Sequence, residues 1–200
     1  MINQNAVQKE EPVLEPVPSL VKLDLACGDL KVKGFVGVDI VNTGECDVVH
    51  DLKIAPWPWD DNAVDEARCS HFLEHLKPQE RITFMNELYR VLKPEAGCLF
   101  TTPLGFERMV QDPTHEWPPI VPASYLYFDK QWLEENKLGH YRELHGIACD
   151  FDVRPLEMGV TAEFALRNDE HKMFAARHYR NAATDLSVLL VKRKKKEKEP

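Results

Sequence analysis

Asp24-Leu-Ala-Cys-Gly28 is followed, eleven residues after its glycine, by Asp39 in the stretch Gly37-Val-Asp39-Ile40. Residues 21–25 and 35–38 are predicted to be consecutive strands; a turn of small residues follows the first, and the second ends at an acidic residue. A carboxylate at that position can accept hydrogen bonds from both hydroxyls of a ribose, and the tight turn lets backbone approach the ligand. The two stretches predict a nucleoside-binding site.

The first turn lacks the G-x-G-x-x-G sequence that seats a pyrophosphate, because Gly28 is the one glycine of the three that is present. This disfavours a nicotinamide dehydrogenase. A nucleoside pocket without a phosphate grip suits S-adenosylmethionine, which carries a ribose, an adenine, a sulfonium and an amino acid but no phosphate.

Six segments, in this order and at workable spacing, resemble those of the class I S-adenosylmethionine-dependent methyltransferases, particularly the small methyltransferase domain 11 kind. They are residues 23–28, 37–39, 50–52, 56–62, 65–76 and 87–94. The resemblance implies an α/β fold with a Rossmann-like, mostly parallel sheet and an antiparallel C-terminal edge hairpin. It also implies an enzyme that moves a methyl group from S-adenosylmethionine to a heteroatom of an acceptor.

The chain pattern predicts strands at residues 21–25, 35–38, 47–50, 64–69, 97–102, 151–162 and 185–192. A helix is predicted from Pro78 until just before Lys93, a shorter one from Asp129 to Gly139, and a helical stretch over 169–180. The first three strands are separated by fewer residues than a helical crossover between parallel neighbours needs. The early helices are therefore expected to be reduced.

We divide the chain into a flexible N-terminal arm (1–19), a methyltransferase domain (20–192) and a basic disordered tail (193–200). Within the domain, residues 103–146 are expected to form a lid over the substrate. The net charge is −8 although the last nine residues hold six basic and two acidic side chains, which leaves −12 on the body. Such a surface repels phosphate backbones, so nucleic acid is disfavoured as the acceptor.

No stretch approaches the roughly 20 apolar residues of a membrane span, and the N-terminus has no apolar run of signal-peptide length. Five unevenly spaced cysteines without a C-x-x-C pair predict a reduced, cytoplasmic chain. With its early helices reduced, the adenine side of the pocket is left to be covered by the N-terminal arm or by a second copy. A homodimer is therefore one prediction.

The resemblance implies ten cofactor-binding residues, and these are Asp24, Ala26, Cys27, Gly28, Asp39, Ile40, Asp51, Leu52, Ser70 and His71. Asp24 helps to organise the loop around the methionine end, and Ala26, Cys27 and Gly28 contact the cofactor through backbone. Asp39 binds the ribose, and residues 51–52 bind the adenine. Residues 70–71 follow the fourth strand, beside the sulfonium.

The predicted catalytic residues are His115 and Asp112, in a D-P-T-H segment of a kind that occurs in related small methyltransferases. A neutral histidine can take a proton from an acceptor hydroxyl or amine. Methyl transfer needs little else, because the leaving group is neutral and in-line positioning supplies much of the acceleration. The alternatives are that His115 only positions the substrate or only packs the segment.

Residues 71–75 also spell H-x-x-E-H, in which two histidines bind zinc and a glutamate acts as base. A zinc hydrolase using His71, Glu74 and His75 is thus an alternative. That motif belongs within a helix, whereas a strand here runs straight into His71, and the same lettering recurs in methyltransferases. We therefore predict no metal. A further alternative is a non-catalytic module that binds S-adenosylmethionine and a partner.

No sequence motif identifies the methyl acceptor. Methyltransferases of adenine or cytosine amino groups usually show N/D-P-P-Y/F after the fourth strand, where this chain reads Ser-His-Phe-Leu. A small molecule, a sugar or a protein side chain is therefore preferred to DNA.

Overall fold

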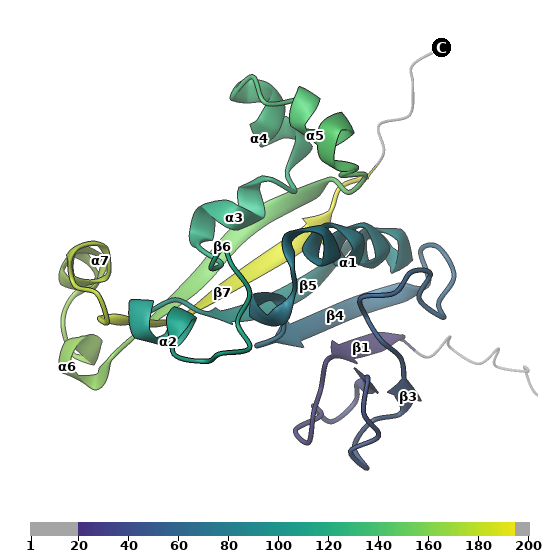
Figure 1. Cartoon of the computed structure of the whole chain (residues 1–200), viewed down its shortest axis with the longest axis horizontal. Helices are drawn as coiled ribbons and strands as arrows, with labels where there is room; N and C mark the ends of the chain where they lie inside the picture. Colours follow the sequence, from purple (N-terminus) through teal and green to yellow (C-terminus); the bar gives the residue numbers. More distant parts are fainter. Residues whose placement is uncertain (1–19, 195–200) are drawn as a thin grey trace, which may run out of the picture.

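The computed structural model describes residues 20–194, so the predicted arm and residues 195–200 of the predicted tail lie outside the described residues. Within them, seven strands form one sheet in the order β3-β2-β1-β4-β5-β7-β6 (Figure 1). The strands are β1 (Lys22–Leu25), β2 (Val36–Asp39), β3 (Val48–Val49), β4 (Val64–Ser70), β5 (Leu92–Pro103), β6 (Phe151–Val160) and β7 (Ala183–Lys192).

The first five strands are parallel, and β7 pairs antiparallel with both β5 and β6. This confirms the predicted mostly parallel sheet with an antiparallel C-terminal edge hairpin. From β1 the chain moves outward through β2 to β3 and then returns to β4 on the other side of β1. The carboxyl ends of β1 and β4 therefore meet at a topological switch point, where open α/β sheets bind their ligands.

The helices are short except for one. They are η1 (Leu73–His75), α1 (Pro78–Val91), α2 (Phe106–Val110), α3 (Pro122–Leu126), α4 (Lys130–Glu135), α5 (His140–His145), α6 (Ala162–Ala165) and α7 (Asp169–His178). None of them lies between β1 and β3, where the connections are turns, so the predicted reduction of the early helices is confirmed. No helix within residues 20–194 has the length and apolar character of a membrane span.

One face of the sheet packs on α1, which begins at Pro78 because proline's fixed φ suits the first helical position. The buried ring of Phe84 on α1 meets Phe100 of β5 edge to face, with 6.2 Å between centroids. On the opposite face Arg68 of β4 pairs with Leu99 of β5, and Leu99 is exposed. The core of the described chain is therefore concentrated on the α1 side.

Strand β5 begins at Leu92, five residues before the predicted start. The β4–β5 register shifts between Val64 and Glu66, and Glu95 has a left-handed φ of 68°. The proline–glycine turn that the sequence indicates at 94–97 is thus absorbed into the strand as an irregularity, because its flanking residues still pair with β4.

Candidate active site

A cleft of about 330 Å³ lies at the carboxyl edge of the sheet, beside the switch point. Its walls come from the ends of β1, β2, β3 and β4 and from η1. The lining residues are Ala26, Gly28, Asp39, Ile40, His50, Asp51, Leu52, Lys53, His71, Phe72, His75 and Leu76. Seven of the ten predicted cofactor residues are among them, so one cleft gathers residues that the sequence spreads over four strand ends.

Asp39 stands on the rim of this cleft, at the end of β2. Its Oδ2 accepts a hydrogen bond from the backbone N–H of Gly28 at 2.9 Å, and its Oδ1 accepts one from the N–H of Val41 at 3.1 Å. The carboxylate thereby fixes the turn after β1 against the end of β2. Each carboxylate oxygen has two lone pairs, so both oxygens retain acceptor capacity for hydroxyl groups of a ligand.

The turn after β1 has an unusual backbone. Ala26 and Gly28 both have left-handed φ values, 56° and 51°. The conformation costs a non-glycine residue on the order of 1 kcal/mol or more, so at Ala26 the surrounding structure must hold it in place. Glycine adopts it freely, and the space where a Gly28 side chain would stand is open. A ligand can therefore approach the backbone here.

Three predicted cofactor residues do not line the cleft: Asp24, Cys27 and Ser70. Asp24 is 3% exposed, and its Oδ2 accepts from the N–H of Val32 at 2.8 Å while lying 3.5 Å from the Arg68 guanidinium. Through its hydrogen bond to Val32, Asp24 stabilises the loop after β1 from the buried side. The Cys27 thiol is buried as well, and this burial raises its pKa to about 11. Ser70 is half-buried on β4.

The sequence prediction missed five lining residues. His50 and Lys53 flank the predicted pair at the end of β3, and Phe72, His75 and Leu76 continue from His71. Four of them lie inside the segments 50–52 and 65–76 that carry the resemblance, and Lys53 directly follows the first of these, so counting every residue of each segment and its following turn would have found them. The sequence does not show how many residues after each strand remain at the edge of the sheet and so line the cleft.

The backbone of buried Leu52 is held in place by Trp57. The Trp57 indole N–H donates to the Leu52 carbonyl at 3.1 Å, and the Trp57 backbone N–H donates to the Glu87 carboxylate of α1 at 2.7 Å. Arg90 holds the same carboxylate at 2.7 Å and keeps the pKa of Glu87 below its usual range. Helix α1 therefore positions the part of the cleft at residues 51–53.

A second hollow, of about 200 Å³, adjoins the cleft and shares two residues with it, His71 and His75. We call it the acceptor hollow. Its lining residues are His71, Glu74, His75, Pro103, Arg108, Gln111, Asp112 and His115. Both predicted catalytic residues therefore lie together beside the cofactor cleft.

Histidines and carboxylates face one another in the acceptor hollow. His115 Nε2 lies 4.0 Å from Asp112 Oδ2, and His71 Nδ1 lies 3.3 Å from Glu74 Oε1. The bond to Glu74 raises the pKa of His71 above its ordinary value. The backbone N–H and hydroxyl of Thr114 both donate to Asp112 and lower the pKa of that carboxyl. The sequence prediction had assigned Glu74 and His75 only to the alternative zinc site.

A buried arginine of α1 fixes the loop that carries His115. The Arg81 guanidinium donates to the carbonyls of Leu73 at 3.1 Å, Glu116 at 3.0 Å and Pro118 at 2.6 Å. The backbone N–H of Glu116 also donates to the Glu74 carbonyl at 2.8 Å. This network ties the loop to η1, so the distance between His115 and His75 is set by packing.

The predicted lid at residues 103–146 faces the site only through its first part. The acceptor hollow is lined by Pro103, Arg108, Gln111, Asp112 and His115 of this segment, whereas α4 and α5 lie toward the other end of β6 and β7 from α2 (Figure 1). The rings of Tyr127, Trp132 and Tyr141 pack on one another within this segment. These three rings therefore pack within the segment, whereas Tyr125 packs on Phe100 of β5 and Trp117 is exposed.

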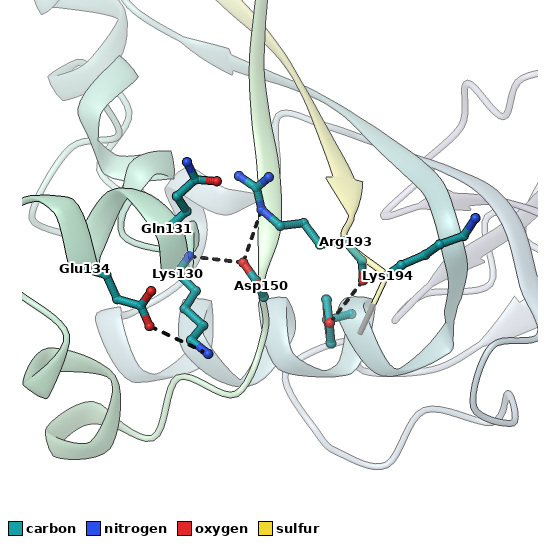
Figure 2. A pocket seen from close by; sticks show the side chains of 7 residues that line it. Lys130, Gln131, Glu134, Asp150, Arg193 and Lys194 are labelled. Carbon is teal, nitrogen blue, oxygen red and sulfur yellow. Dashed lines mark hydrogen bonds and ion pairs between the residues drawn. The ribbon is translucent and has the colours of Figure 1, made fainter. Parts of the chain in front are cut away.

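A larger hollow, of about 550 Å³, lies beside α4 and the end of β7 (Figure 2). Its charges are paired among themselves: Lys130 with Glu134 at 3.7 Å, and Arg193 with Asp150 at 3.4 Å. It contains none of the predicted site residues. Arg193, which the sequence analysis placed in the tail, also bonds Asp129 at 2.8 Å and so packs against the domain.

Comparisons with known proteins agree with this geometry. Residues 31–100 match the family described as methyltransferase domain, and this stretch contains most of the cleft. Over this stretch the chain is similar to methyltransferases, and its fold is that of a SAM dependent methyltransferase structure. The match supports the predicted cofactor, S-adenosylmethionine.

Two solved structures are similar to this chain over most of its length. One is a SAM dependent methyltransferase from Archaeoglobus fulgidus, with a TM-score of 0.56 at 18% identity, over 88% of this chain and 87% of that one. The other is a 16S rRNA (adenine(1408)-N(1))-methyltransferase from Catenulisporales acidiphilia, with a TM-score of 0.50 at 15% identity, over 90% of each chain. These identities support a shared fold alone. No curated protein matches the chain.

Proposed function

We propose that this methyltransferase binds S-adenosylmethionine in the cleft at the carboxyl edge of its sheet and transfers the methyl group to a heteroatom of an acceptor in the adjoining hollow. One observation carries the proposal: the cleft and the hollow meet at His71 and His75, so a donor site opens directly onto an acceptor site. A methyl group at that junction has an in-line path from donor to acceptor.

The residues of the cleft fit the donor. Asp39 offers carboxylate oxygens to the ribose hydroxyls, and Gly28 leaves room for close backbone approach. Leu52 and Phe72 supply apolar surface for the adenine, and Asp51 is placed to accept from its amino group. Asp24 and Cys27 act behind the loop by holding its shape. When bound, S-adenosylmethionine supplies an electrophilic methyl group whose leaving group is a neutral thioether.

His115 is the proposed base. Its Nδ1 lies 3.0 Å from the Met109 carbonyl, which can only accept, so Nδ1 carries the proton and Nε2 is free to take one. The acceptor heteroatom loses its proton to Nε2 as it gains the methyl group. The Asp112 carboxylate, 4.0 Å from Nε2, stabilises the imidazolium that results.

We propose a small molecule, a sugar or a protein side chain as the acceptor in preference to nucleic acid. The acidic balance of the chain body supports this, as does the modest size of the acceptor hollow. We also propose a cytoplasmic location, which the five free cysteines support, and a homodimer. Exposed apolar side chains on α6 and α7 support the dimer, among them Phe174 and Leu166, which is 99% exposed.

Isothermal titration with S-adenosylhomocysteine tests the donor site. We expect Asp39→Ala to weaken binding at least about tenfold, because charged hydrogen bonds contribute about 1.5–3 kcal/mol each. Asp29→Ala is the matched control, since Asp29 is an exposed acid next to Gly28 in the turn after β1 but does not line the cleft. Equal affinities for wild type and Asp39→Ala would remove the site assignment.

A second measurement tests the base. With an acceptor found by screening for release of S-adenosylhomocysteine, His115→Ala should lower turnover about 100-fold or more while its affinity for S-adenosylhomocysteine stays unchanged. Unchanged turnover would contradict the role of His115, and binding without turnover on any acceptor would favour the non-catalytic module.

A further inference from the structure

We propose that Glu74, His75 and His115 bind one divalent transition-metal ion in the acceptor hollow. Each of the three offers a ligand atom, and these atoms all lie within 4.8 Å of one another. Two ligands come from η1 and the third from the loop after α2, 40 residues further along the chain. The metal site itself does not depend on the proposed function. Its role in holding an acceptor rests on that function.

The three side chains need only a small contraction to surround an ion. Ligand bonds of 2.0–2.2 Å in tetrahedral geometry place neighbouring ligand atoms about 3.3 Å apart. The rings of His75 and His115 already meet edge to face, with 4.9 Å between centroids. Arg81 fixes the His115 loop to η1 through its three carbonyl bonds, so the approach of the two histidines is built into the fold.

The hydrogen bonding of His115 leaves its Nε2 as the nitrogen that can bind a metal. Nδ1 lies 3.0 Å from the Met109 carbonyl oxygen and must donate to it. In the neutral ring the lone pair is then on Nε2. Metal-binding histidines usually have this arrangement, in which the far nitrogen donates to a carbonyl or carboxylate and fixes the tautomer.

The same conclusion follows for His75 by way of Thr114. The Thr114 hydroxyl donates to Asp112 Oδ1 at 2.7 Å, because a carboxylate oxygen can only accept. A hydroxyl has a single proton, so its 2.9 Å contact with His75 Nδ1 requires Nδ1 to be the donor. His75 Nε2 therefore also holds a lone pair. Both histidines are prepared as ligands without any change of tautomer.

Glu74 supplies an independent observation. The residue is 4% exposed, and its Oε2 is buried without a hydrogen-bond partner among the described residues. The other oxygen, Oε1, bonds His71 Nδ1 at 3.3 Å. Leaving a buried carboxylate oxygen unpaired is costly, and native proteins rarely do so without a reason. A cation beside Oε2 would remove that cost.

The donor set indicates the class of ion and of acceptor. Two imidazoles and one carboxylate are the ligands of many catalytic Zn²⁺ sites and of facial-triad sites for other first-row ions, which keep positions open. Oxygen atoms of an acceptor can fill these positions, and the ion makes a bound hydroxyl more acidic. We therefore infer an acceptor that binds through oxygen. With the ion bound, His115 Nε2 is a ligand and the ion itself makes the acceptor hydroxyl more acidic; without the ion, Nε2 is the base described above.

The test uses the full-length chain, freed of any affinity tag and of metal by chelation, titrated calorimetrically with Zn²⁺ and with Mn²⁺. We expect one ion per chain for at least one of the two. His115→Ala and Glu74→Gln should each weaken binding about 100-fold or more, and Thr114→Val about tenfold through loss of the bond to His75. His140→Ala, at an exposed histidine outside both hollows, is the control and should bind as wild type does.

Titrating the same samples with S-adenosylhomocysteine distinguishes failure of the metal site from failure of the proposed function. A variant that binds S-adenosylhomocysteine is also shown to be folded. If wild type binds no ion, or if His115→Ala and Glu74→Gln bind it as tightly as His140→Ala does, the metal site is refuted, whatever the nucleoside affinity. If ion binding depends on these residues while S-adenosylhomocysteine fails to bind, the metal site holds and the proposed function fails.

Discussion

The two carboxylates at the centre of this site, Asp39 and Glu74, are treated differently by the fold. Both oxygens of Asp39 accept from backbone N–H groups of turns, and the side chain remains half-exposed at the cleft. Glu74 is buried and has one oxygen without a hydrogen-bond partner among the described residues. Asp39 therefore stabilises a loop and can still accept hydrogen bonds from hydroxyl groups. The unpaired oxygen of Glu74 would be stabilised by a bound cation.

Gly37 tests how tightly the cofactor loop packs on β2. A Cβ at this position would lie 2.7 Å from Lys31 Cδ and 2.9 Å from Cys27 Sγ and from a backbone oxygen. We expect Gly37→Ala to lower the free energy of unfolding by about 1–3 kcal/mol, as overpacking does, and to weaken S-adenosylhomocysteine binding. Urea denaturation measures the first effect. Gly139→Ala, whose nearest neighbour would be 3.9 Å away, is the control.

At the scale of elements, α1 organises both halves of the site. Its first turns carry Arg81, which fixes the loop of His115, and its last turns carry Glu87, which anchors Trp57 below the cleft. A single helix thus sets the distance between the donor cleft and the acceptor hollow. Displacing α1 would disturb both at once.

The Glu87 carboxylate gives a pH-dependent prediction. Its pKa is lowered by the bond to Arg90, so its stabilising contribution is present above the unfolded-state pKa of about 4.3 and is lost as pH falls through the lower folded-state pKa. We expect Glu87→Gln to cost about 1–3 kcal/mol of unfolding free energy at pH 7. Chemical denaturation at several pH values should show the gap between wild type and variant closing below about pH 4. A gap that is constant with pH would contradict this role.

The elements around the cleft could be predicted because parallel strands end at one edge of a sheet. Knowing that Gly28, Asp39 and Asp51 follow successive strands was enough to expect them together. The meeting of Glu74 with His115 could not be predicted, because it depends on long-range bonds of Arg81 to loop carbonyls. The sequence contains no local periodicity that encodes such bonds. For the same reason the early start of β5 was missed, since pairing with β4 overrode the turn signal at 94–97.

At the scale of the whole molecule, the apolar surface of α6 and α7 lies at the same edge of the sheet as the site. The two helices connect β6 to β7 beside α2 (Figure 1), and Asp185 at the start of β7 lies 3.7 Å from His71 Nε2 of the acceptor hollow. They expose Leu166, Met173 and Phe174. Association through these helices would place a second copy near the α2 side of the acceptor hollow, while the donor cleft lies further along the sheet at β1–β4.

Sedimentation velocity tests the dimer. We expect wild type to sediment as a dimer at tens of micromolar, and Leu166→Asp combined with Phe174→Asp to give a monomer, because two charges would be buried in the contact. The thermal midpoint should change little, since both side chains are exposed. A wild type that stays monomeric at all concentrations would refute the dimer.

The most direct test of the donor site is a crystal structure of the chain with S-adenosylhomocysteine. We predict that the ribose hydroxyls lie within about 2.6–3.2 Å of the Asp39 carboxylate oxygens and that the sulfur points toward His71 and the acceptor hollow. Density for the nucleoside elsewhere, such as in the hollow beside Arg193, or a ribose with no contact to Asp39, would contradict the account.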